Sequence, residues 1–154
     1  MGMVYTFKRI SPADAARISA DPELAWDLLE AHRRTDDEPC GDLDKAWDGL
    51  QYLLAKTEVG IDLLREDRGR PDDETCTVVW TVEEVAGAAR TLAATPFEVL
   101  AEHFDLAALD EEGIYPDIWD TDWCADYVRE HYAGLREFFA HAAATESAAV
   151  ARFE

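Results

Sequence analysis

The sequence has few cysteines and no long apolar run. Its three cysteines, Cys40, Cys76 and Cys124, are odd in number, and no two of them form a CxxC pair. This spacing excludes a disulfide framework and the usual zinc-binding patterns, so we expect reduced thiols in a cytoplasmic protein. No stretch approaches the roughly 18 apolar residues of a membrane-spanning helix, and we expect no association with a membrane.

The sequence also lacks the short motifs that mark common active sites. It contains no GxSxG, P-loop, GxGxxG or HExxH pattern, and the acidic pair Asp42 and Asp44 is too short to be a calcium-binding loop. The four histidines are scattered along the chain, at His32, His103, His131 and His141. We therefore expect no cofactor and no metal site, and we favour a protein that is not an enzyme.

Positive charge is scarce as well. Lys and Arg number 14 against 34 Asp and Glu, which gives a formal net charge of −20. Residues 1–70 carry 10 basic and 15 acidic side chains, whereas residues 71–154 carry 4 and 19. A surface of this sign repels phosphate backbones, which argues against binding to nucleic acid, and it attracts basic partners.

What the sequence does have is enough apolar material for one hydrophobic core, at 48% of its residues. The hydropathy pattern predicts strands where residues alternate or are β-prone, at 3–10 and 76–80. Cap residues and three-four spacing predict helices beginning at Pro12 and Pro22, a helix over 43–55, and helices beginning at Thr81, at the Thr95–Glu98 capping box and at Asp105. Residues 57–75 are predicted to form a long loop with a short ordered piece at 61–64.

The C-terminal part of the chain predicts one long amphipathic helix. It starts near residues 120–122, and its apolar side chains run at steps of three and four to Ala142. The few residues after it are expected to fray. Together these patterns predict an α+β fold: a single, mostly helical domain over residues 1–154 with a small β-sheet and a long C-terminal helix.

Aromatic side chains interleaved with carboxylates are the best candidates for a binding site. One group lies in the predicted third helix and the other in the segment IYPDIWD, residues 114–120. Asp44 and Asp48 are four residues apart, which would place both on one helix face. The tentative ligand-binding residues are Asp44, Trp47, Asp48, Tyr52, Tyr115, Asp117 and Trp119. The alternative is that the aromatic residues belong to the core and the acids are solvated.

Five segments, in this order, resemble the YfbM-like family of bacterial proteins, whose domain has no known function: MGMVY, LDKAWDGLQYLL, TVEEVAGAARTL, IYPDIWD and YVREHYAGLREFFAHAAA. The resemblance spans nearly the whole chain and implies a cytoplasmic bacterial protein with one mostly helical α+β domain. It implies no activity. The positions that carry over are Asp44, Trp47, Asp48, Tyr115, Pro116 and Trp119. Family members tend to have a glycine-rich segment with an arginine before the helix that begins at Thr81, where this chain has CTVVW.

These observations favour a non-enzymatic domain that binds a small ligand or a protein, at the junction of the third helix with residues 114–120. Two alternatives remain open. One is an acidic inhibitor or immunity-type protein that binds a basic partner, because residues 71–154 are so strongly acidic. The other is a metal-dependent hydrolase with paired carboxylates. The sequence leaves the oligomeric state open.

Overall fold

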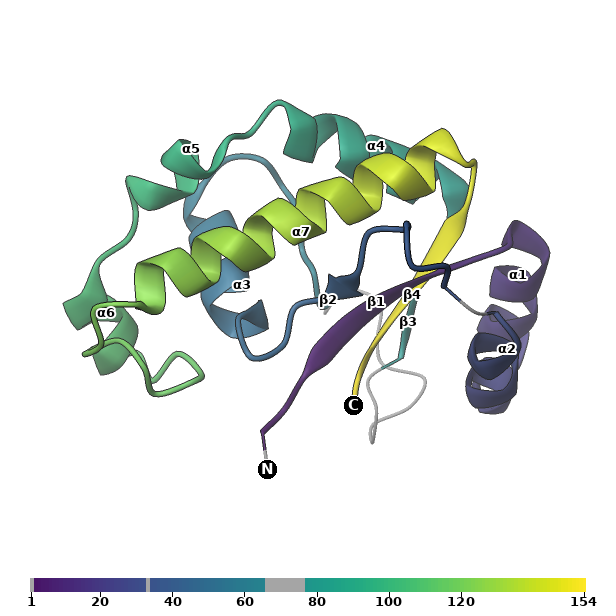
Figure 1. The fold of residues 1–154 in the computed structure, drawn as a ribbon, viewed down its shortest axis with the longest axis horizontal. Coiled ribbons are helices and arrows are strands. Elements are labelled where there is room, and N and C mark those ends of the chain that lie inside the picture. The colour runs from purple at the N-terminus through teal and green to yellow at the C-terminus, as the bar shows by residue number, and fades with distance from the viewer. Residues whose placement is uncertain (1, 33, 66–76) are drawn as a thin grey trace.

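A small antiparallel sheet runs through the middle of the molecule (Figure 1). The computed structural model describes residues 2–32, 34–65 and 77–154. Within them the strand order is β2-β1-β4-β3, with bounds β1 Tyr5–Ile10, β2 Gly41–Asp42, β3 Val78–Trp80 and β4 Ala148–Phe153. The first and last strands of the chain therefore pair at the centre of the sheet, with Tyr5 opposite Phe153 and Ile10 opposite Ala148.

Helices cover both faces of this sheet. One face carries α1 (Pro12–Ala20), the short 3-10 helix η1 (Pro22–Leu24) and α2 (Ala25–Ala31). The other helices surround the larger hydrophobic cluster: α3 (Trp47–Lys56), α4 (Val82–Ala93), α5 (Phe97–Ala101), α6 (Leu106–Glu111) and the long α7 (Cys124–Ala144). The predicted α+β class, with a small sheet and a long C-terminal helix, is confirmed.

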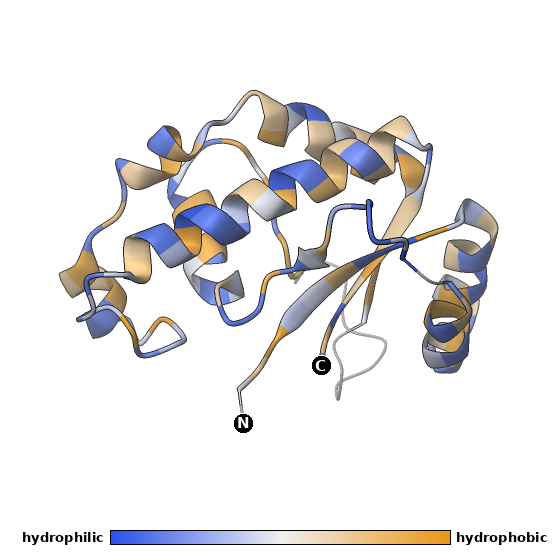
Figure 2. Ribbon diagram, in the orientation of Figure 1, coloured by the Kyte–Doolittle hydropathy of each residue, from blue (hydrophilic) through white to orange (hydrophobic). Residues whose placement is uncertain are grey.

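Strand β4 joins the two hydrophobic clusters because its residues alternate between them. Ala148 and Val150 pack with α1 and α2 in the smaller cluster. Ala149 and Ala151 point to the other face and belong to the larger cluster. Helix α7 is amphipathic. Figure 2 shows hydrophilic and hydrophobic residues alternating along it. One side of α7 is therefore buried on the sheet and on α4, while the other faces solvent.

Local sequence signals explain where α1, α4 and α6 begin and where α6 ends. The Ser11 hydroxyl accepts a hydrogen bond from the Asp14 backbone at 3.1 Å and begins α1 as predicted. Thr81 and Glu84 form the predicted capping box at the start of α4, with bonds of 3.2 and 2.9 Å. Asp105 caps α6, and Gly113 follows that helix with the predicted left-handed backbone, at a φ of 66°. These caps satisfy backbone N–H groups that would otherwise lack a partner.

The predicted helix start at Pro22 is confirmed: the Asp21 side chain caps it, and its first turn is the 3-10 helix η1, which α2 follows directly. Three other predictions of helix starts were wrong. Residues 43–46 form a turn, so the third helix begins at Trp47 and not at residue 43. The Thr95–Glu98 capping box does not form, because the Thr95 hydroxyl donates to the Thr91 carbonyl at 2.7 Å and Pro96 precedes the first helical residue. Helix α7 begins at Cys124, a turn later than predicted.

The predicted fraying of the chain after α7 was also wrong. Residues 148–153 are strand β4, which pairs with β1 on one side and β3 on the other. The second predicted strand, 76–80, is shorter in the structure, at Val78–Trp80, and residue 76 lies outside the described residues. The same holds for residues 66–75 of the predicted long loop. Its predicted ordered piece contains Leu63, which is fully buried.

Candidate functional site

The structure does bring the third helix and the segment 114–120 together. The Trp47 and Tyr115 rings lie with their centroids 5.8 Å apart. The Asp48 carboxylate accepts a hydrogen bond from the Tyr115 backbone N–H at 2.9 Å. Trp47 and Trp119 are both buried. The predicted junction therefore exists, and its aromatic residues form part of the larger core.

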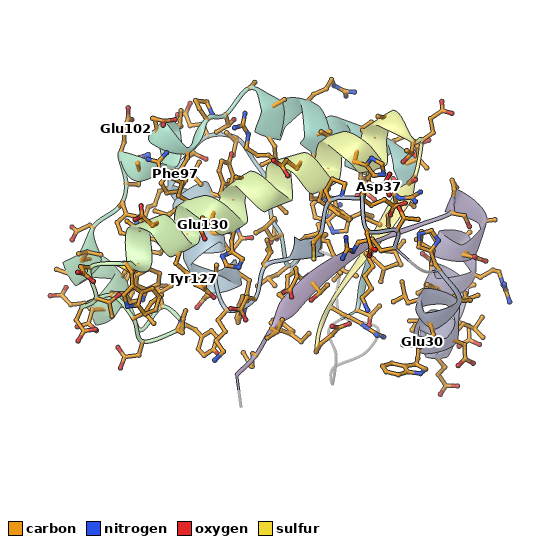
Figure 3. All side chains as sticks on the ribbon, in the orientation of Figure 1. Glu30, Asp37, Phe97, Glu102, Tyr127 and Glu130 are labelled. Atoms are coloured by element: carbon orange, nitrogen blue, oxygen red, sulfur yellow. The ribbon has the colours of Figure 1, made fainter. Side chains whose placement is uncertain are left out.

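Asp44 also lies in this region, but its backbone position differs from the predicted one. It lies in the turn before α3 with a φ of 47°, so it does not share a helix face with Asp48. Its carboxylate instead accepts a hydrogen bond from the Tyr127 hydroxyl of α7 at 2.8 Å. The same hydroxyl accepts a hydrogen bond from the Lys45 backbone N–H at 3.1 Å. Burial and the hydrogen bond to Asp44 raise the pKa of Tyr127, so this link persists into alkaline solution. Figure 3 shows Tyr127 toward the N-terminal end of α7.

The polar atoms of the junction are used mainly by neighbouring residues. The Trp47 indole donates to the Met3 carbonyl at 2.9 Å, and the Trp119 indole donates to the Ile114 carbonyl at 2.7 Å. The Tyr115 hydroxyl accepts a hydrogen bond from the Met3 backbone N–H at 3.0 Å. Groups bound in this way are not free to bind a ligand without losing a partner, so the arrangement favours a structural role.

The remaining two candidates lie at the edge of the junction. Tyr52 is half-buried against the core, and the Lys56 ammonium lies 5.0 Å from its ring centroid. Asp117 lines an open hollow of about 330 Å³, together with Asp110, Gly113, Ile114, Tyr115 and Trp119. Among the described residues, no group of three His, Cys, Asp or Glu side chains could hold a metal ion, so the structure gives the hydrolase alternative no metal centre there.

A substitution at Gly49 tests how tightly α3 packs on Trp119. A Cβ at this position would lie 2.8 Å from Cη2 of the Trp119 ring, closer than such atoms approach. We expect Gly49→Ala to lower the free energy of unfolding by about 1–3 kcal/mol through overpacking, although alanine favours a helix. Gly87→Ala in α4 is the matched control. There the nearest atom, in the Arg90 side chain, is 3.9 Å away, and we expect a gain of about 0.5–1 kcal/mol. Urea unfolding of both variants measures the difference, and equal effects would contradict the packing.

A second cavity lies elsewhere, where the short strand β2 ends. Gly41 pairs with Phe7, and residues 34–40 before this pair form no strand beside β1. The space between β1, this segment and the C-terminal half of α7 is a cavity of about 240 Å³. It is lined by Thr6, Phe7, Lys8, Arg9, Leu29, His32, Arg34, Glu38, Pro39, Cys40, Gly41, Phe138 and His141. We call it the β1–α7 cavity.

Positive side chains dominate the walls of the β1–α7 cavity. Arg9 donates to the Ser147 hydroxyl at 3.1 Å and to the Glu38 carboxylate at 2.5 Å. Arg34 donates to the Glu38 backbone carbonyl at 2.7 Å, and Lys8 pairs with Glu154 at 2.8 Å. Glu38 is the one acidic residue of the lining. In a chain with a net charge of −20, this grouping of cations is a local exception.

Three nitrogen atoms of the cavity lining lack a partner. They are Nε of Arg9 and Nε2 of His32 and of His141, each buried and without a hydrogen bond to the described residues. Buried polar atoms usually have a hydrogen-bond partner, and leaving one without it costs about 1–3 kcal/mol. Three such atoms around one cavity indicate a place for a polar ligand or for ordered water.

Sequence reasoning missed this cavity. Its lining comes from residues 6–9, 29–41 and 138–141, which no motif spacing connects. Of these residues, Cys40, His32 and His141 could be noticed in the sequence only as isolated residue types.

Figure 3 places Asp37 close to the C-terminal end of α7, far along the helix from Tyr127. A hydrogen bond from Thr35 and the attraction of His141 both lower the pKa of Asp37.

The described residues contain no helix long and apolar enough to cross a membrane. Fold and site together define a helix-covered, four-stranded antiparallel α+β domain. A family model for a domain of unknown function, DUF1877, matches residues 1–151, and the chain belongs to this family. The YfbM-like resemblance seen in the sequence is confirmed.

One solved structure shows the same fold. The crystal structure of YfbM from Escherichia coli, a protein of unknown function, matches with a TM-score of 0.72 and 17% sequence identity. The match covers 99% of this chain and 100% of that chain. At this identity the likeness extends to the fold and not to a site. None of the curated proteins matches the chain.

Proposed function

We propose that this protein is a non-enzymatic domain that binds a small ligand in the β1–α7 cavity. One observation carries the proposal: three residues that line a single cavity, Arg9, His32 and His141, each have a buried nitrogen atom without a hydrogen-bond partner among the described residues. The volume of about 240 Å³ has room for roughly eight waters at about 30 Å³ each. Drug-sized sites usually begin near 300 Å³, so a ligand here is a small metabolite.

The construction of the cavity also supports a binding role. One wall is the central sheet, and another is α7, which packs along the sheet and α4. The third wall is a loop held in place by Arg9 and Glu38 and by the contacts of Arg34 with the loop backbone. A rigid scaffold with one loop wall positions polar groups in advance, which lowers the entropy that binding would otherwise lose.

Fragment screening by NMR tests this proposal. We expect fragment-induced shifts of backbone amide signals to gather on Lys8, Arg9, Cys40 and the end of α7. The response should weaken in His141→Phe, which removes a nitrogen atom without a partner but keeps a ring of similar size. His103→Phe is the control, because His103 lies outside the cavity lining. Shifts that gather instead on the hollow at Asp117, or no fragment binding at all, would overturn the proposal.

The acidic C-terminal half of the chain favours a second candidate function, that of an inhibitor that binds a basic protein. Residues 71–154 carry 19 acidic and 4 basic side chains. Two of the four, Arg129 and Arg152, pair with Glu98 and Glu154, which leaves most carboxylates facing solvent. Binding to a basic partner would weaken steeply with salt, whereas binding of a fragment in the cavity would not depend on such a partner.

A further inference from the structure

We infer that the ligand of the β1–α7 cavity is a small anion with an apolar body, an inference that rests on the proposed function and names its ligand class. The cavity offers both surfaces such a molecule needs. Phe7, Leu29, Pro39 and Phe138 supply an apolar wall. The remaining lining is mostly basic or imidazole-bearing.

The balance of charge points to an anion. The described lining holds Lys8, Arg9 and Arg34 and one carboxylate, that of Glu38, while Lys8 also pairs with Glu154 outside the lining. The hollow beside Trp119 has the opposite character, because its described lining holds Asp110 and Asp117 and no basic residue. An anion entering the β1–α7 cavity meets attraction where the rest of the surface repels it.

Arg34 is the guanidinium best placed to receive the acid group. Its hydrogen bonds go to the backbone carbonyls of Thr35 and Glu38, and no carboxylate of the described residues forms an ion pair with it. Arg9, in contrast, already holds Glu38, but its Nε is buried and lacks a partner. A guanidinium matches the two oxygens of a carboxylate or phosphate. The anion would supply the acidic partner that Arg34 lacks among the described residues.

A set of four probes with the same ring tests the charge preference. Benzoate and phenyl phosphate are anions, benzyl alcohol is neutral and benzylammonium is a cation. By NMR titration of the full chain we expect both anions to bind at least about tenfold more tightly than benzylammonium, as expected for charge-assisted hydrogen bonds. Equal or tighter binding of benzylammonium would overturn the inference.

Two variants with the same change in net charge test whether the preference for anions arises in the cavity. Arg34→Gln should weaken benzoate binding by about tenfold, because it removes the guanidinium that lacks a carboxylate. Arg17→Gln makes the same change of net charge on α1, outside the cavity lining, and should alter binding less than about twofold because salt screens distant charges. Equal losses in both variants would mean that net charge, not the cavity, sets the affinity, and would overturn the inference.

Cys40 supplies a second measurement that does not depend on tight binding. It is a free, exposed thiol on the cavity wall, whereas Cys124 is buried and its thiol hydrogen-bonds to the Thr121 carbonyl. In a Cys76→Ser background, we expect an anionic methanethiosulfonate reagent to modify Cys40 faster than a cationic one of similar size. Faster reaction with the cationic reagent would overturn the inference. Fragments that bind the cavity without regard to charge would also overturn the inference of an anionic ligand, but the proposed binding function would stand. If no fragment bound at all, both the inference and the proposed function would be overturned.

Discussion

A carboxylate placed at position 151 should unfold the protein or nearly so. Ala151 is fully buried in the central strand β4, opposite Phe7 of β1 and Val78 of β3, with its side chain in the larger core cluster. An aspartate there would bury a charge among apolar side chains, and we expect Ala151→Asp to lower the free energy of unfolding by about 4 kcal/mol or more. Total stabilities of small domains are about 5–15 kcal/mol, so most of the stability would be lost.

The control for this prediction adds the same charge where it is harmless. Ala13 is exposed in the first turn of α1, where a carboxylate interacts favourably with the helix dipole. Ala13→Asp should change the stability by no more than about 0.5 kcal/mol. Urea unfolding followed by circular dichroism and tryptophan fluorescence compares the two variants. Near-native stability in Ala151→Asp would mean that residues 148–153 do not form the centre of the sheet.

Strand β4 is also the element of the fold that was hardest to predict from the sequence. Three of its six residues, AAVARF, are alanines and they follow an alanine-rich helix end, and alanine is the best helix former. A strand buried on both faces shows no alternation of polar and apolar residues. The break between α7 and β4 is made by Glu146 with a φ of 52°, a conformation usually signalled by glycine. By contrast, β1 and α4 were predictable because alternation and a capping box are local signals.

The two candidate sites show the same limit. The junction of α3 with residues 114–120 was found because aromatic and acidic residues stand out in short segments. The placement of Asp44 was wrong because the turn at residues 43–46 shows the same apolar spacing as the helix after it. The β1–α7 cavity depends on where β2 stops pairing and on the path of the loop before it. Such features arise from tertiary contacts, so neither spacing nor residue type could reveal them.

Removing the Trp47 side chain should separate a packing role for the junction from a ligand-binding role. Its ring lies 4.8 Å from that of Phe153 and 5.8 Å from that of Tyr115, measured between centroids, and its indole donates to the Met3 carbonyl. Trp47 therefore ties α3 to the last strand, to the segment 114–120 and to the N-terminus. We expect Trp47→Ala to lower the free energy of unfolding by about 3–5 kcal/mol.

Trp26→Ala is the matched control, because the same atoms are deleted from a ring that is 61% exposed, although it lies 5.1 Å from the guanidinium of the buried Arg152. It should cost less than about 1 kcal/mol. Trp47→Phe should fall between the two, since it keeps a ring in the core but loses the hydrogen bond to Met3. If Trp47→Ala unfolded at the same urea concentration as Trp26→Ala, the core would not depend on Trp47. The aromatic and acidic side chains of the junction would then need another explanation, and a ligand bound there would become the better one.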